Sequence, residues 1–170
     1  AFQNISEDQY ASLFSQVIDV ELTNDFLPFL YPNQYVNFSQ DSKAVSLAAQ
    51  LTSGLTSDVE ALTAIYEYVT ANITYDNEKA ATVSGNYLPD IDETLSTKKG
   101  ICFDYASLTA AMLRSIGIPA KLAIGYSASV RHAWIDVYIQ SVGWVERAVE
   151  FNGDEWKLMD PTFAATGTDE

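Results

Sequence analysis

The segment Gly100-Ile101-Cys102-Phe103-Asp104-Tyr105-Ala106 decides the fold of this chain, because it places a cysteine where a helix begins. Apolar side chains recur behind it at helical spacing, and they predict a helix over residues 102–116 with one apolar side. Gly117 and Pro119 end that helix, since glycine favours the C-terminal turn and proline cannot continue it. The cysteine therefore lies in the first turn of the predicted helix.

This position predicts a reactive thiol at Cys102. The first turn of a helix exposes unpaired backbone N–H groups and a partial positive charge, and both stabilise a thiolate. Thiols in such positions have pKa values of about 3.5–7.5. The same N–H groups suit the oxyanion that forms when a carbonyl is attacked, and we expect Gly100 to leave the approach to the sulfur open. Taken alone, Cys102 also fits a small apolar residue packed at a helix start.

Strand patterns follow the cysteine helix. Residues 120–126 form the first expected strand, residues 132–139 alternate strictly between an apolar and a mixed face, and residues 143–151 and 156–160 form two more. The Asn152-Gly153 pair predicts a tight turn between the last two strands. Helices that come first and an antiparallel run of strands that comes afterwards indicate the α+β class.

Upstream of the cysteine, the sequence predicts three helices. The first follows a capping box at residues 6–9, the second begins at Asp41 or Ser42, and the third covers residues 58–73. Prolines interrupt the segment 24–40, so it cannot form a continuous helix, and we expect its aromatic rings to pack against the rest of the domain. Residues 76–99 are expected to form a loop. The side chains expected to face inward are Tyr10, Leu13, Phe14 and Val17 in the first helix, Val45, Ala48, Leu51 and Leu55 in the second, and Val59, Leu62, Ile65, Tyr66, Val69 and Ile73 in the third.

Two further residues match catalytic roles beside Cys102. His132 opens the strictly alternating strand, and Asp160 ends the last strand. Histidine titrates near neutrality, as a general base must, and a carboxylate that accepts its Nδ1–H fixes the tautomer and stabilises the imidazolium. The three residues match a nucleophile, a base and an orienting acid. Separately, His132 also fits a hydrogen-bonded strand residue, and Asp160 fits a surface Asp-Pro turn.

Composition excludes several classes of function. The 170 residues are 48% apolar and 19% charged, which fits one globular domain that needs no disulfide or metal for its core. The net charge of −14 argues against nucleic acid and anionic lipid as partners, because both require a basic surface. A single cysteine and a single histidine exclude an internal disulfide and a site with two histidine ligands. No apolar run reaches the length of a membrane-spanning helix, so we expect no membrane insertion.

Taken together, these motifs resemble the bacterial transglutaminase-like superfamily, which has a papain-like core. The resemblance implies Cys102 as nucleophile, His132 as base and Asp160 as the third member of a triad. We accordingly expect one transglutaminase-like domain over residues 1–170, with an N-terminal extension at 1–56 and a catalytic core at 57–163. The matching motifs are GICFDYA at 100–106, LRSIGIPA at 113–120, Gly125-Tyr126, His132-Ala133-Trp134 and LMDPT at 158–162.

The resemblance leaves the oxyanion donor open. Animal members use an indole upstream of the cysteine, whereas all three tryptophans here follow Cys102. Tyr87 stands at the matching place and is our candidate donor together with the backbone of Cys102; the alternative is an anchoring loop aromatic. Animal transglutaminases also depend on calcium, but none of their calcium loops is matched here. We expect Asp90, Asp92 and Glu93 to form a solvated acidic loop, with no metal and no cofactor.

The resemblance implies one acyl-enzyme with several outcomes. The Cys102 thiolate attacks an amide of a peptide or protein substrate, an amine leaves with a proton from His132, and a second acceptor takes the acyl group. Water as acceptor gives a peptidase or amidase, which we favour, and a lysine amine gives a crosslinking transglutaminase. A catalytically silent binding or interaction module of a larger surface protein is the third alternative.

Three features of the sequence also bear on the cellular location of the protein. The chain starts at Ala1, has a single cysteine and is acidic. Together with the family resemblance, these features predict a bacterial extracellular or cell-envelope domain whose upstream segment has been removed.

Overall fold

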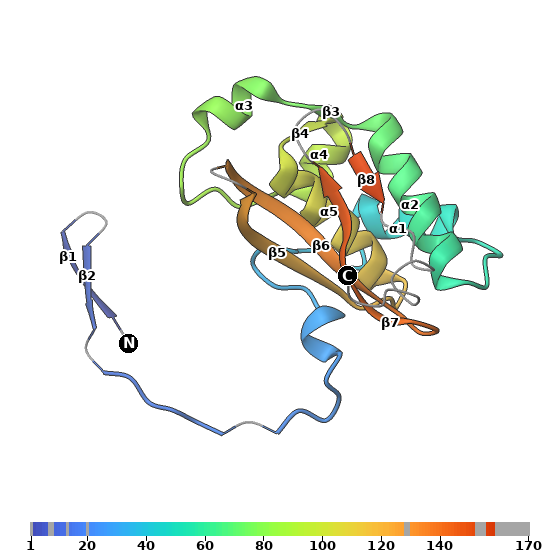
Figure 1. The fold of residues 1–170 in the computed structure, drawn as a ribbon. Coiled ribbons are helices and arrows are strands. Elements are labelled where there is room, and N and C mark those ends of the chain that lie inside the picture. The colour runs from blue at the N-terminus through green and yellow to red at the C-terminus, as the bar shows by residue number, and fades with distance from the viewer. Residues whose placement is uncertain are drawn as a thin grey trace, which may run out of the picture.

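The computed structural model of the protein describes residues 2–6, 9–12, 14–19, 21–127, 130–151 and 156–158. The helical elements are η1 Leu27–Phe29, α1 Lys43–Leu51, α2 Asp58–Asn72, α3 Asn77–Thr82, α4 Ile91–Thr97 and α5 Cys102–Ser115. The strands are β1 Phe2–Ser6, β2 Gln9–Ser12, β3 Thr74–Tyr75, β4 Lys99–Gly100, β5 Ala120–Ser127, β6 Val130–Ile139, β7 Gly143–Phe151 and β8 Trp156–Leu158. Figure 1 shows their arrangement.

Helix α5 is the central element of the core. It contacts α1, α2 and α4 as well as strands β5 and β6, and every residue from Asp104 to Arg114 is buried (Figure 1). The helix over 102–116 is therefore confirmed, but the expectation of one apolar side was too narrow. A helix covered on all sides packs small and apolar residues around its whole circumference, as α5 does with its alanines and leucines.

The strands after α5 form one antiparallel sheet in the order β5-β6-β7-β8. The register pairs Ala120 with Val137 and Gly125 with His132, so β5 pairs with β6 along its length. The predicted apolar face of β6 is buried, which confirms the strict alternation read from the sequence; its residues are Ala133, Ile135, Val137 and Ile139. Helices that precede and cover an antiparallel sheet confirm the α+β class.

Two of the three predicted upstream helices are present. Helix α2 follows its prediction closely, because Leu62, Ile65 and Val69 are buried along one stripe. Helix α1 buries Ala44 and Ala48, but it ends at Leu51. Leu55, which we expected to face inward, is exposed, because Gly54 takes a positive φ and turns the chain away.

The first predicted helix is wrong. Strands β1 and β2 pair antiparallel, with Ser6 opposite Gln9, and Figure 1 shows this hairpin apart from the body of the protein. A short helix draws most of its stability from packing an apolar face, which is missing where no body lies alongside. Ser6 and Gln9, the two ends of the predicted capping box, instead belong to these two strands.

The predicted loop over residues 76–99 is also wrong. It contains α3 and α4, and strand β3, directly before it, pairs in parallel with strand β4 at its end. Each helix starts at an aspartate: Asp76 accepts the Lys79 N–H, and Asp90 accepts the N–H groups of Asp92 and Glu93. The acidic residues expected in a solvated loop are thus the cap and first turn of α4, where negative charge is stabilising. Six or seven residues are too few for a clear apolar period.

The aromatic segment 24–40 packs on the body through its rings, as predicted. The ring of Phe26 lies 4.5 Å from that of Tyr138, and the ring of Phe29 lies 5.3 Å from that of Trp144. Lys121 Nζ lies 3.6 Å from the Trp144 ring centroid. These residues cover the face of the sheet opposite to that packed on α5, because Tyr138 alternates with the buried side chains of β6.

Arg114 joins the end of α5 to two distant segments. Its Nε and Nη2 donate to the Ala120 carbonyl at 2.9 and 2.7 Å, and its Nη1 donates to the Tyr31 carbonyl at 2.8 Å. Burial lowers the pKa of its guanidinium to about 10. The Arg114 guanidinium therefore binds two backbone carbonyls that are poorly accessible to water.

We expect Arg114→Met to lower the free energy of unfolding by about 2–4 kcal/mol, because charge-assisted hydrogen bonds are lost and buried carbonyls are left unpaired. Urea denaturation followed by circular dichroism measures this change. Lys43→Met, which replaces an exposed cation at the start of α1, is the matched control and should unfold like the native chain. Equal midpoints for the two variants would contradict this role of Arg114.

Candidate active site

A two-stranded parallel pairing positions the start of α5. The Thr74 N–H donates to the Lys98 carbonyl and the Asp76 N–H donates to the Gly100 carbonyl, both at 2.9 Å. The pairing brings the end of α2 and the start of α3 against the first turn of α5. Cys102, the first residue of α5, thus lies beside α3 and is half-buried.

Asp104 is a fully buried carboxylate two residues from the cysteine. Its Oδ2 accepts the Ile101 N–H at 2.8 Å and lies 2.9 Å from Lys79 Nζ. Its Oδ1 accepts the Tyr87 hydroxyl. The carboxylate thereby caps α5, neutralises Lys79 and anchors the segment that follows α3. Sequence analysis missed this network, although an acid at the third position of a helix is a recognisable capping signal.

Gly100 has a different role from the predicted one. A Cβ at this position would lie 2.7 Å from Asp104 Cβ, closer than carbon atoms tolerate. The absence of a side chain at Gly100 therefore makes room for the Asp104 carboxylate that caps the helix. We expected Gly100 to leave the approach to the sulfur open, but its close contacts are with Asp104. A larger residue would push the cap away from Ile101.

Tyr87 lies at the cavity that holds the cysteine, but its hydroxyl is engaged. Burial, followed by the hydrogen bond to Asp104, raises its pKa to about 12. Lys79 Nζ also lies 4.4 Å from the centroid of its ring. A phenol has one proton to donate, and here Asp104 accepts it. Stabilisation of an oxyanion by Tyr87 would require exchanging that bond for one to the substrate, and it stays a prediction.

Cys102 and His132 line the same cavity, which has a volume of about 370 Å³. His132 lies in β6, is 7% exposed, and stacks on Trp134 with ring centroids 6.4 Å apart. The backbone N–H of Ala133, the next residue of β6, donates to the Cys102 sulfur. The structure therefore brings the predicted nucleophile and the predicted base to one cavity, as the α5 and β6 patterns implied.

Two opposing effects act on the Cys102 thiol. Burial raises its pKa, and the negative charge of Asp104 raises it further, whereas the N–H groups of Ala133, Phe103 and Cys102 itself lower it. Burial is the largest effect, so the position at the helix start does not by itself produce the low pKa that we expected. A buried thiol of this kind needs a neighbouring base to lose its proton at neutral pH.

The comparison with known proteins identifies the family. The model of the transglutaminase-like superfamily matches residues 45–147. The chain belongs to this superfamily. The uncharacterised protein YebA from Bacillus subtilis is 27% identical in an alignment 139 residues long, which covers 69% of this chain and 19% of YebA. Membership confirms the resemblance drawn from the cysteine, histidine and Gly-Ile-Pro motifs.

Solved structures carry the same fold. A candidate cysteine protease from Cytophaga hutchinsonii is 27% identical with a TM-score of 0.58, and the match covers 74% of this chain and 42% of that one. The periplasmic domain of TgpA from Pseudomonas aeruginosa is 20% identical with a TM-score of 0.53, over 78% of this chain and 46% of that one. The chain thus spans less than half the length of these three proteins.

The third expected member of the transglutaminase-like triad, Asp160, lies outside the described residues. Strand β8 ends at Leu158 and pairs with β7, which in turn pairs with β6. The role of Asp160 as the orienting acid stays a prediction.

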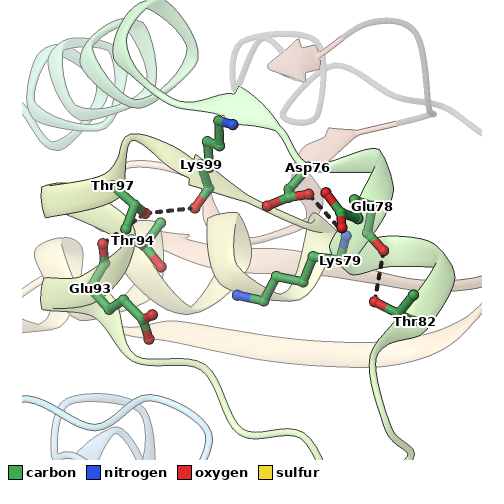
Figure 2. Close-up of a pocket in the computed structure, with 8 residues that line it drawn as sticks. All are labelled: Asp76, Glu78, Lys79, Thr82, Glu93, Thr94, Thr97 and Lys99. Atoms are coloured by element: carbon green, nitrogen blue, oxygen red, sulfur yellow. Dashed lines mark hydrogen bonds between the residues drawn. The ribbon is translucent and has the colours of Figure 1, made fainter.

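A second, polar pocket of about 380 Å³ lies between α3 and α4. Figure 2 shows side chains of the two helices facing each other across it, with Lys79 between them. Within the part of the chain that the structure describes, no group of histidine, cysteine or acidic residues is arranged to hold a metal ion, and no helix is long and apolar enough to cross a bilayer.

Proposed function

We propose that this transglutaminase-like domain is a cysteine-dependent acyl-transfer enzyme that hydrolyses peptide or side-chain amide bonds. One observation carries the proposal: the only cysteine of the chain and its only histidine lie on different elements and line one cavity. Nucleophile and base must share a cavity in which a carbonyl can be placed against the sulfur.

The reaction proceeds through a thioester. His132 takes the Cys102 proton, and the sulfur attacks the amide carbonyl carbon. The resulting oxyanion lies at the start of α5, where the first backbone N–H groups have no partner within the helix and can donate to it. The C–N bond breaks as the departing amine receives the proton from His132. Water, deprotonated by His132, then attacks the thioester, which releases a carboxylic acid and restores the thiol. Asp160 would accept the second N–H of His132 throughout.

Hydrolysis is favoured over crosslinking by one comparison. The structural relative from Cytophaga hutchinsonii, 27% identical, is a candidate cysteine protease. If a primary amine of a second protein took the acyl group in place of water, the reaction would crosslink two proteins. A non-catalytic binding module would catalyse neither hydrolysis nor crosslinking. Incubation with a peptide amide and a fluorescent primary amine separates the three: we expect acid and free amine as products and no fluorescent adduct. Adduct formation would indicate a transferase, and no reaction would overturn the proposal.

The pH dependence of Cys102 labelling has an expected sign. In the native chain His132 accepts the thiol proton, so iodoacetamide labelling should already be fast near pH 6–7, where unperturbed histidine titrates at about 6.5. In His132→Ala, burial and Asp104 keep the pKa of the thiol raised, and labelling should become fast only above pH ~8.5. Mass spectrometry across pH 5–10 measures both profiles. Coincident profiles would show that His132 does not assist the thiol.

We also assign the domain to the cell envelope or the exterior of a bacterial cell. The fold match to a periplasmic domain of Pseudomonas aeruginosa supports this location. Fractionation of cells that express this protein, followed by its detection in the cytoplasmic and non-cytoplasmic fractions, tests the location; recovery in the cytoplasm alone would contradict it.

A further inference from the structure

We propose that the cavity beside Cys102 and His132 is a subsite that binds an uncharged, apolar side chain of the substrate, adjacent to the amide bond that is attacked. The inference rests on the proposed acyl-transfer function and adds to it a class of substrate. It follows from the shape, charge and rigidity of the cavity walls.

The walls come from several parts of the fold and are mostly apolar. Ala80 and Val83 come from α3 and its end, Ile101 and Phe103 from the start of α5, and Ile124 from β5. The volume of about 370 Å³ is at the small end of the range for ligand sites. Such a cavity holds one residue-sized group next to the sulfur. Figure 1 shows the segment after α3 passing the ends of β5 and β6, and its residues Ser84, Gly85 and Tyr87 line the cavity.

The buried ion pair near the start of α5 does not line the cavity. Asp104 is fully buried and bonds with Lys79, and neither residue lines the cavity. Among its described lining residues, the ionisable groups are Cys102, His132 and two tyrosines. A charged substrate side chain would therefore lose its water without gaining an opposite charge, which is costly in a half-enclosed site. An apolar side chain loses nothing and gains contact with the walls.

The wall opposite β6 is held in place before any substrate binds. The Tyr87 hydroxyl donates to Asp104, and its ring meets that of Phe103 edge-on, with centroids 6.3 Å apart. Helix α3 itself is capped by Asp76 and joined to the core by the Lys79–Asp104 ion pair. Because the wall is tied at both ends, the cavity keeps its shape, and binding does not have to order it.

Alkylating probes with different side chains test the subsite. We would compare N-acetyl aminoacyl chloromethyl ketones that carry the side chain of leucine, phenylalanine, glutamate or lysine; in each, the Cys102 sulfur displaces chloride and forms a thioether. We expect the leucine and phenylalanine probes to label Cys102 about 10–100-fold faster than the charged probes, as one apolar side chain in a pocket allows. Labelling by iodoacetamide, which has no side chain, normalises the rates.

A variant in the wall and a matched control sharpen the comparison. Val83→Asp places a carboxylate in the cavity, so the leucine probe should slow about tenfold or more and the lysine probe should gain relative to it. Leu88→Asp makes the same change at an exposed position of the same segment, outside the cavity, and should keep the native order. Thermal unfolding of both variants checks that α3 is intact.

Binding to an unreactive protein separates this inference from the proposed function. Saturation-transfer NMR of Cys102→Ala should detect N-acetyl-leucinamide and not the amides of glutamate or lysine. Selective binding without any reaction of the native chain would sustain the subsite and refute the catalysis. Equal labelling by all probes, with Cys102 reactive toward iodoacetamide, would refute the subsite and leave the catalysis standing.

Discussion

His132→Ala is expected to slow the cleavage of a peptide amide at pH 7 by about 10²–10⁴-fold, the contribution of a general base that also protonates the leaving group. The expected loss is large because burial raises the pKa of Cys102, so little thiolate forms without the histidine. The rate of amine release at saturating substrate measures the change.

Two controls accompany this variant. Gln140→Ala, at an exposed position directly after the same strand, should retain the native rate. Circular dichroism and thermal unfolding should show that His132→Ala keeps its fold, because the side chain lies at the end of β6 and not in the apolar face. A well-folded His132→Ala protein with native activity would show that another group serves as the base.

Asp160→Asn is expected to slow the same reaction by about 10–10³-fold. The amide preserves the shape of the carboxylate but donates a hydrogen bond where the carboxylate only accepts. His132 then presents the wrong tautomer to Cys102, and the imidazolium loses its counter-charge. The pH profile of iodoacetamide labelling is a second readout, which should shift toward higher pH.

The alternative for Asp160 predicts a different result. A carboxylate in a surface turn would change the unfolding free energy by less than about 0.5 kcal/mol when replaced and would leave the chemistry of Cys102 unaltered. Asp19→Asn, at an exposed position far from Asp160 in the sequence, gives the baseline for such a change. Rates equal to this baseline would reduce the site to a Cys102–His132 pair.

The elements that sequence analysis predicted well are those with long, regular patterns. Helix α2 carries its apolar stripe over four turns, and strand β6 alternates over residues 132–139, so neither depends on a distant partner for recognition. Cys102 and His132 could be recognised from the sequence because Cys102 lies in the first turn of helix α5 and His132 lies among the first residues of strand β6. The meeting of α5 with β6 at one cavity follows from the topology once both are assigned.

The elements that were missed depend on contacts between segments far apart in the sequence. Helices α3 and α4 are short, and their positions depend on the pairing of Thr74 with Lys99 and on the ion pair of Lys79 with Asp104. These contacts span about twenty residues that look polar and irregular. The raised pKa of Cys102 has the same origin, because burial by β6 outweighs the local effect of the helix start.

Trapping of the acyl-enzyme tests the central claim most directly. The native chain is mixed with a reactive peptide ester or amide, quenched in acid within milliseconds to seconds, and analysed by intact-protein and peptide mass spectrometry. The account predicts that the mass of the acyl group appears on the peptide containing Cys102, disappears on treatment with hydroxylamine, and is absent from Cys102→Ala. Substrate turnover that persists in Cys102→Ala, or an acyl group on any other residue, would contradict it.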